Sequence, residues 1–295
     1  MRATLRRTLG LAWVLPALVL VGVFVYLPLV QNLQFSTLNW DIYSGSQEYV
    51  ALGNYTKLVE DPIFWSSLGN NALYAVISIA FQVFGALVLA ALIESIRGER
   101  WRRALRAIYF IPAALSLTVA GLLFYFIYEP NLGPLNHALR AIGLDGFAQA
   151  WLGQESTAMT AIIAMSQWQG FGYSTLLFAV AIQRIPSEIY GAAAIDGVGP
   201  VRRFVHVTVP LVREMTGLMA IVTISGAFQV FNEVMVMTGG GPNNSTQVLG
   251  TWLYRSGFVR NNFGYAAAIA TVLFVITLGI AVAQLWVTRR RRVEW

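Results

Sequence analysis

Apolar residues gather in six long blocks along the chain, and polar residues gather between the blocks. Each block is long enough, as an α-helix rising about 1.5 Å per residue, to cross roughly 30 Å of hydrocarbon. No block alternates like the strand of a membrane barrel, and helices pair their backbone groups without partners from the lipid. The predicted membrane helices are Leu9–Val30, Leu68–Ile93, Ala107–Tyr128, Ala158–Ile182, Thr216–Met237 and Tyr265–Val287.

The composition agrees with a membrane location. Apolar residues make up 57% of the 295 residues and charged residues 12%, whereas about a quarter of the residues in a soluble domain are charged. We therefore expect an all-α integral membrane protein of about six transmembrane helices, forming a single domain over residues 1–295. No metal site is expected, because the chain has no cysteine and its two histidines, His137 and His206, fall on opposite sides of the predicted membrane.

The first apolar block resembles a signal peptide in one respect, since Arg2, Arg6 and Arg7 precede it. Its apolar run is too long for the core of a signal peptide, and no small-residue cleavage pattern follows at residues 31–40. We expect a retained membrane helix.

Basic residues lie mainly on one side of this topology. With the N-terminus inside, 16 of the 20 Lys and Arg residues fall in cytoplasmic segments, and only Lys57, Arg140, Arg255 and Arg260 fall outside. The positive-inside rule then predicts that both termini are cytoplasmic. The same distribution explains the net charge of +6 without a nucleic-acid partner.

The longest cytoplasmic stretch, about residues 183–214, has a helical pattern of its own. Pro186 suits a helix start and Glu188 its first turn, while Asp196-Gly197 and Gly199-Pro200 force a turn. A second amphipathic stripe begins at Val201 and is interrupted by Pro210. The residues Ile185, Ile189, Ala192 and Ala193 share a face of the first helix by their spacing.

This stretch therefore predicts two short helices that meet at a tight corner, and Gly197 is expected to have a positive φ there. From periodicity alone, an interfacial helix pair that anchors the loop to lipid remains an equal alternative.

The residues of the loop resemble the "EAA" motif of binding-protein-dependent ABC importer permeases. Ala192-Ala193, Asp196-Gly197 and Val209-Pro210 fit the spacing of that motif, and Gly191 stands where the motif has its glutamate. The resemblance implies that the loop forms coupling helices that dock into a groove of an ATPase subunit. The implied coupling residues are Glu188, Gly191, Ala192, Ala193, Asp196 and Gly197.

Further motifs along almost the whole chain are similar to the sugar-permease branch of this family, the maltose/glycerol-phosphate type. They are Gly53-Asn54-Tyr55, Ile111-Pro112, Tyr128-Glu129-Pro130 with Gly133 and Asn136, Phe228–Glu233, Thr238–Pro242 and Gly264–Ala268. The resemblance implies a type I importer fold in a bacterial or archaeal plasma membrane. Its implied partners are a second, homologous permease, two ATP-binding subunits and an extracytoplasmic solute-binding protein.

The chain itself is expected to be non-catalytic and to hold no cofactor. It contains no Gly-x-x-x-x-Gly-Lys-Ser/Thr sequence, so ATP and Mg²⁺ would be bound by the partner ATPase. The Gly239–Pro242 loop is predicted to be a flexible external turn that faces a binding protein, not a phosphate site.

Polar side chains within the predicted membrane helices are candidates for a sugar pathway, because such groups are costly in lipid. Amides match sugar hydroxyls, and aromatic rings offer a flat apolar face to the sugar ring. Interhelical hydrogen bonding is the competing interpretation for each residue. The candidates are Gln167, Trp168, Gln169, Tyr173, Gln229, Asn232 and Glu233, of which Glu233, near a helix end, is also open to simple solvation.

Two other classes of membrane protein compete with the importer subunit. A secondary transporter of small polar solutes normally shows inverted repeats and buried ionisable groups, and the segment interiors here have almost none. A membrane-embedded enzyme would need a cluster of His, Asp, Glu or Cys at one depth, and none can be assembled from this sequence.

Overall fold

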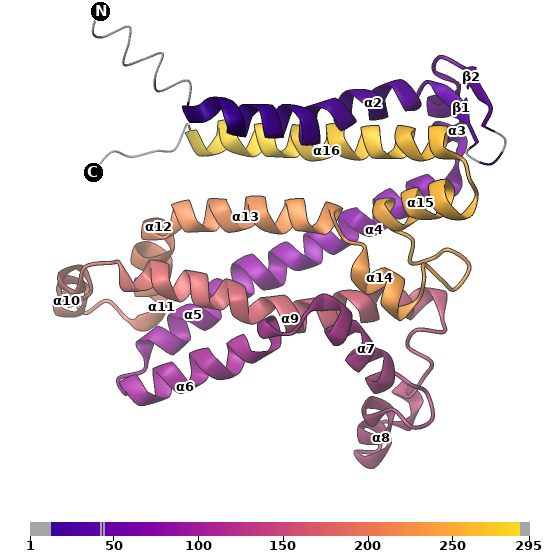
Figure 1. Cartoon of the computed structure of the whole chain (residues 1–295). Coiled ribbons are helices and arrows are strands. Elements are labelled where there is room, and N and C mark those ends of the chain that lie inside the picture. Colours follow the sequence, from indigo (N-terminus) through magenta and orange to yellow (C-terminus); the bar gives the residue numbers. More distant parts are fainter. Residues whose placement is uncertain (1–12, 42, 44, 290–295) are drawn as a thin grey trace, which may run out of the picture. The chain divides into compact units, whose positions relative to one another are not determined.

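The structure is a computed structural model that describes residues 13–41, 43 and 45–289, and helices dominate it (Figure 1). Among these residues, three helices are long and apolar enough to cross a membrane: Trp13–Phe35, Pro62–Ser95 and Phe263–Gln284. Two bent helix pairs raise the number to five if each pair counts as one span. The all-α membrane fold predicted from the sequence is therefore confirmed, with one small β-hairpin added.

The chain divides into two compact units. The first comprises residues 1–62 and 253–275, of which residues 1–12, 42 and 44 are not described. Its helix Trp13–Phe35 includes a π-helical turn, and the strands β1 and β2 form an antiparallel hairpin in which Leu38 pairs with Tyr49. Its elements are η1 (Gly22–Tyr26), α2 (Leu27–Phe35), β1 (Leu38–Trp40), β2 (Gln47–Tyr49), α3 (Gly53–Glu60), η6 (Arg255–Val259) and the first part of α16 (Phe263–Arg289).

Two residues of the predicted family motifs hold this hairpin in place. The buried Asn54 donates hydrogen bonds from Nδ2 to the carbonyls of Ser36 and Leu38, at 2.9 and 2.8 Å. Gly264 lets the same Leu38 carbonyl approach the start of α16, because a β-carbon at position 264 would lie 1.8 Å from that oxygen.

The second unit comprises residues 63–252 and 276–295, and it contains the long helix α9. Its elements are α4 (Pro62–Ser78), η2 (Ile79–Gly85), α5 (Ala86–Ser95), α6 (Glu99–Phe110), η3 (Ile111–Ala114), α7 (Leu117–Ile127), α8 (Pro134–Ala141), η4 (Asp145–Phe147), α9 (Glu155–Gln183), α10 (Ser187–Ile195), α11 (Pro200–Arg203), η5 (Phe204–Thr208), α12 (Val209–Leu211), α13 (Arg213–Phe228), α14 (Asn232–Met237) and α15 (Leu249–Tyr254).

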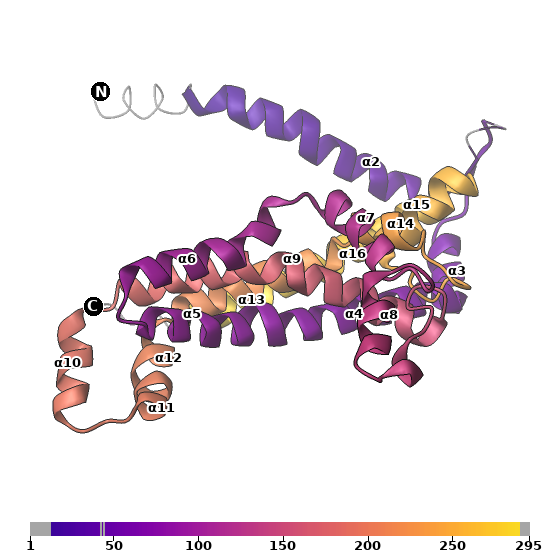
Figure 2. The same ribbon diagram turned by 90° about the horizontal axis from the view of Figure 1, so that it is seen from below.

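Helix α9 is the centre of this unit and lies alongside α5 and α6 (Figures 1 and 2). Its 29 residues contribute to both apolar cores, one around Ile162 and Val234 and the other around Phe178 and Met219. It corresponds to the predicted helix Ala158–Ile182, although its polar residues keep it out of the three most apolar spans.

The structure corrects two of the six predicted segments, which are broken instead of continuous. In the third, η3 contains Pro112, and the helices before and after Leu115-Ser116 differ in direction by 92°. Ser116 then caps α7 by accepting a hydrogen bond from the amide of Val119 at 3.3 Å. The fifth segment stops at Phe228, and α14 begins only at Asn232. In the third segment, proline and local capping therefore override an apolar pattern that by itself predicts a straight helix.

Candidate coupling loop and translocation pathway

The cytoplasmic loop predicted from the sequence forms two short arms, α10 and α11, joined by a turn (Figure 2). Gly197 has φ +70°, as predicted. Its amide donates to the Ala194 carbonyl at 3.1 Å, and the Val198 amide donates to the Ala193 carbonyl at 3.0 Å. This pair of bonds is a Schellman motif, which satisfies the last carbonyls of α10 and requires a left-handed residue after the helix.

The two arms are tied to each other and to the helix bundle. The Tyr190 hydroxyl and the Thr208 Oγ1 lie 3.1 Å apart, and the guanidinium of Arg203 lies 5.6 Å from the Tyr190 ring centre. Ile185 and Phe204 pack against the core around Phe178 and Met219. These contacts join the base of the loop to the core that α9 and α13 share.

The exposed surface of the corner is more apolar than the sequence reasoning recognised. Ile195 is 88% exposed and Val201 is 76% exposed, one on each side of the turn. The sequence analysis did not single out Ile195. An aliphatic residue directly before the Asp196-Gly197 turn is the feature of the sequence that could have indicated it. The two exposed aliphatic side chains therefore flank the same turn.

The predicted coupling residues divide by exposure. Glu188, Gly191, Ala192, Asp196 and Gly197 are exposed. The helix face predicted to hold Ile185, Ile189, Ala192 and Ala193 is also divided, since Ile185 packs inward and Ile189 and Ala192 are exposed.

Ala193 differs from its neighbour Ala192 in being only 8% exposed. A larger side chain at 193 would first disturb the loop itself, and Ala192 is the position that tests a partner. Gly191 has no atom within 4 Å of the place of a β-carbon, so the motif's missing glutamate leaves open surface at that point.

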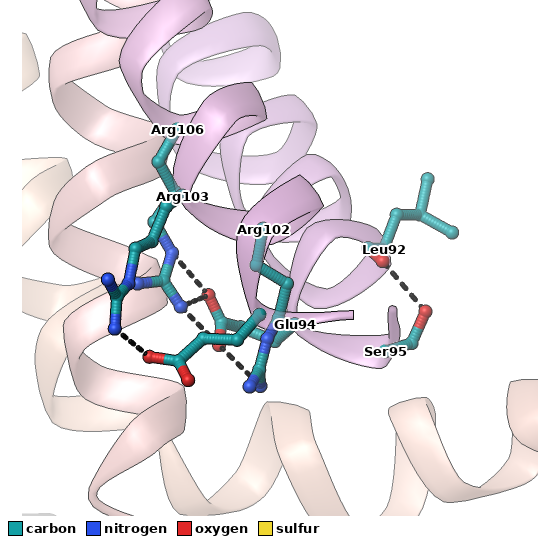
Figure 3. Close-up of polar contacts among 7 residues, drawn as sticks. Leu92, Glu94, Ser95, Arg102, Arg103 and Arg106 are labelled. Carbon is teal, nitrogen blue, oxygen red and sulfur yellow. Dashed lines mark hydrogen bonds and ion pairs between the residues drawn. The ribbon is translucent and has the colours of Figure 1, made fainter. Parts of the chain in front are cut away.

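A charged cluster joins α5 to α6 close to the loop (Figure 3). The Glu94 side chain is 8% exposed and accepts hydrogen bonds from Nε and Nη2 of Arg106 at 2.9 and 2.5 Å. Arg102 lies on the other side of Glu94, with an N–O distance of 3.9 Å, and Arg103 pairs with Glu99. Glu94 is thus already neutralised by Arg106.

Three of the predicted pathway residues are used inside the chain. Gln167 is buried and bonds Ser78 and Gln82, both at 3.0 Å. Gln169 donates to the Leu115 carbonyl at the bend before α7, at 3.0 Å. Glu233 is 3% exposed, which excludes its solvation by water at a helix end, and it accepts a hydrogen bond from Tyr74. These contacts favour packing for the three side chains, although Gln167 also lines a cavity beside α9, and their part in a sugar pathway stays a prediction.

The other four predicted pathway residues are exposed: Trp168, Tyr173, Gln229 and Asn232. Trp168 stands against Phe124, with ring centres 5.0 Å apart, and borders a cavity of about 560 Å³ between α9, α4–η2 and α6–η3. Gln229 and Asn232 flank the break between α13 and α14. Discontinuous helices commonly border transport sites, because their unwound backbone can face a polar solute.

Many hydrogen bonds hold the Gly239–Pro242 loop and the residues that follow it, while its flexibility stays a prediction. Asn70 of α4 donates from Nδ2 to the carbonyls of Ser245 and Gln247, both at 2.8 Å. Thr246 is fully buried and donates to the Gly241 carbonyl at 2.7 Å. Gly240 has φ +90°, and a β-carbon there would collide with Gln247.

Within the described residues, no group of three His, Cys, Asp or Glu side chains could hold a metal ion.

Comparison with known proteins agrees with this arrangement. Residues 86–293 match the family described as binding-protein-dependent transport system inner membrane component. The probable ABC transporter permease protein YurN of Bacillus subtilis is 47% identical over 273 residues, which cover 92% of this chain and 93% of that protein. The diacetylchitobiose uptake system permease protein NgcF of Streptomyces coelicolor is 33% identical, with coverage of 96% and 83%. The sn-glycerol-3-phosphate transport system permease protein UgpA of Yersinia pestis is 31% identical, with coverage of 94% and 93%.

A solved structure shares the fold. A chain of a bacterial ABC transporter that imports the acidic polysaccharide alginate superposes with a TM-score of 0.86 over 99% of both chains, at 21% identity. The family match over most of the sequence and the relatives of full length agree with the coupling loop seen here. The chain therefore belongs to the family of binding-protein-dependent transport system inner membrane components, the permease subunits of ABC transporters.

Proposed function

We propose that this permease carries a sugar or a related carbohydrate into the cell, using ATP hydrolysed by partner subunits. The assembly would contain a second homologous permease, two ATP-binding subunits that hold ATP and Mg²⁺, and an extracytoplasmic solute-binding protein. Both termini and the α10–α11 loop would face the cytoplasm.

The protruding corner between α10 and α11 is the observation that carries the ATP-driven part of this proposal. Its backbone is fixed by the Gly197 turn, its tip exposes Ile195 and Val201, and its base is packed into the bundle. A fixed apolar knob on a rigid lever fits a groove in a motor subunit better than it fits lipid, because exposed Glu188 and Asp196 lie on the same loop.

The substrate class rests on the relatives and on the exposed polar residues. Relatives over nearly the whole chain are named for diacetylchitobiose, for multiple sugars and for lactose. The exposed Trp168, Gln229 and Asn232 provide the aromatic face and the amide groups that recognise sugar rings and hydroxyls.

Co-purification tests the coupling part. The full chain, extracted from its own membrane, should bring an ATP-hydrolysing subunit with it, and Ile195→Asp should reduce the recovered subunit by about tenfold or more, since the carboxylate would be desolvated in the interface. Leu132→Asp is the matched control, because Leu132 is 82% exposed and lies on the opposite, outer side in the predicted topology.

Uptake of labelled sugars by the same cells tests the substrate class. In the co-purification test, equal recovery of the ATPase subunit with the wild type and with Ile195→Asp would contradict the docking surface. Uptake of no member of a panel of mono-, di- and oligosaccharides, with the complex intact, would contradict the substrate class alone.

A further inference from the structure

A cavity of about 630 Å³ lies between the two arms of the coupling loop and the ends of α5, α6 and α9. Its walls include both arms of the loop, and Val201, one of the two exposed residues at the tip, also lines it. Tyr190 and Thr208, which are in contact with each other, both line it. Its volume falls within the usual range of about 300–1,000 Å³ for small-molecule sites.

The floor of the cavity is apolar. Val88 and Leu92 of α5, Ile182 of α9, and Ile185 and Phe204 of the loop all line it. A polar metabolite would gain little from these side chains. A hydrocarbon chain would gain free energy from each methylene group that it buries against them.

The charged side chains at the cavity are mainly basic. Arg102 and Arg203 line it together with Glu94, whose carboxylate already accepts three hydrogen bonds from Arg106 (Figure 3). The Nε of Arg102 is buried and has no hydrogen-bond partner in the part of the chain that the structure describes. The Nη1 of Arg102 lies 3.9 Å from a carboxylate oxygen of Glu94, whereas Arg203 forms no ion pair among the described residues and its guanidinium lies over the Tyr190 ring.

We infer that this cavity binds an anionic phospholipid of the inner leaflet, with a phosphate group at Arg102 and Arg203 and an acyl chain along the apolar floor. The position at the predicted cytoplasmic edge is where basic pockets between membrane helices bind acidic headgroups. A buried guanidinium nitrogen without a partner favours a phosphate oxygen as its acceptor. The bound lipid joins α6 to the coupling loop, so it stiffens the base of the lever.

Native mass spectrometry of the full chain, with the subunits that accompany it, tests this inference. After delipidation the protein is offered equal amounts of phosphatidylglycerol and phosphatidylcholine. The wild type should retain phosphatidylglycerol preferentially, and Arg102→Gln combined with Arg203→Gln should lower that retention by about tenfold. The matched control is Arg100→Gln with Arg213→Gln, which removes the same charge from exposed positions outside the cavity.

A second variant tests the apolar part of the site. Ala91→Phe places a ring in the cavity wall and should reduce retention with both arginines present, while thermal melting reports whether the protein still folds. Glycerol phosphate, which has the headgroup chemistry without acyl chains, should not displace the lipid at equal concentration.

Three results would overturn the inference. The first is equal phosphatidylglycerol retention by the wild type and the Arg102/Arg203 double variant. The second is an equal loss in the Arg100/Arg213 control, which would indicate general surface charge. The third is displacement of the retained lipid by glycerol phosphate at equal concentration.

Discussion

The hydroxyl of Tyr74 on α4 donates a hydrogen bond to a carboxylate oxygen of Glu233 on α14, at 2.8 Å. The same hydroxyl contacts Ser166 on α9, and all three side chains are buried. This network holds α14 against the bundle directly after the break that follows α13. It therefore fixes the backbone that carries Gln229 and Asn232.

Removing the Tyr74 hydroxyl tests whether Glu233 is structural. Tyr74→Phe should destabilise the chain by about 1–3 kcal/mol, because a buried carboxylate loses its donor. Glu233→Gln keeps an acceptor oxygen and should cost less. Thermal melting of the purified protein measures both changes. A Glu233→Gln protein that is as stable as the wild type but no longer transports sugar would instead assign the carboxylate a direct role in transport.

The motifs that mark the family in the sequence mainly build the architecture. Gly133 is required because a β-carbon would lie 2.3 Å from the Glu129 carbonyl, and Asn136 accepts a hydrogen bond from the Trp151 indole at 2.8 Å. Asn54 and Gly264 fix the hairpin in the same way. Their spacing could be read from the sequence, but the atoms that each of them contacts depend on the folded chain, so their roles could not.

The sequence predicted helix positions well and helix continuity poorly. Apolar periodicity located α4–α5, α9 and α16, because burial and length are local properties of the pattern. It did not predict the break after Phe228, where Asn71 of α4 donates to the Ala227 carbonyl at 2.7 Å and accepts from the Leu249 amide at 2.9 Å. Such a break depends on side chains supplied by other elements. The orientation rests partly on Arg2, Arg6, Arg7 and Arg290–Arg292, which lie outside the described residues, and it stays a prediction.

Sugar contact and packing can be distinguished for the predicted pathway residues by comparing exposed residues with one that is hydrogen-bonded within the chain. Asn232→Ala and Trp168→Ala should impair uptake without changing the melting temperature, because a sugar hydrogen bond left unmatched costs about 1–3 kcal/mol, or roughly 5- to 150-fold in affinity. Gln169→Ala should instead lower the melting temperature, since it leaves the Leu115 carbonyl without its donor. Uptake kinetics and melting curves decide each case. Unchanged uptake in the Asn232 and Trp168 variants would assign both residues to packing.

The topology can be tested with single cysteines, because the native chain has none. Cysteines at Leu132 and at Ile195 are both well exposed, and the predicted orientation puts them on opposite faces. A membrane-impermeant thiol reagent added to whole spheroplasts should label the first, and inverted vesicles should label the second. Labelling of both from one face would contradict the assignment of the 129–157 stretch and the coupling loop to opposite sides.

The coupling corner offers the sharpest test, because its backbone and its surface can be changed independently. Gly197→Val should abolish substrate-stimulated ATP hydrolysis, since a β-branched residue at φ +70° costs about 1–3 kcal/mol and would open the turn. Ala192→Trp should have the same effect through a clash with the partner, as Ala192 is exposed. Ala193→Trp should instead lower the melting temperature of the chain by itself, because position 193 is buried within the loop. Glu188→Ala should weaken ATPase attachment, since Gly191 leaves Glu188 as the carboxylate in the first turn of α10. Full coupled ATPase activity in both Gly197→Val and Ala192→Trp would mean that the loop only anchors the chain to lipid.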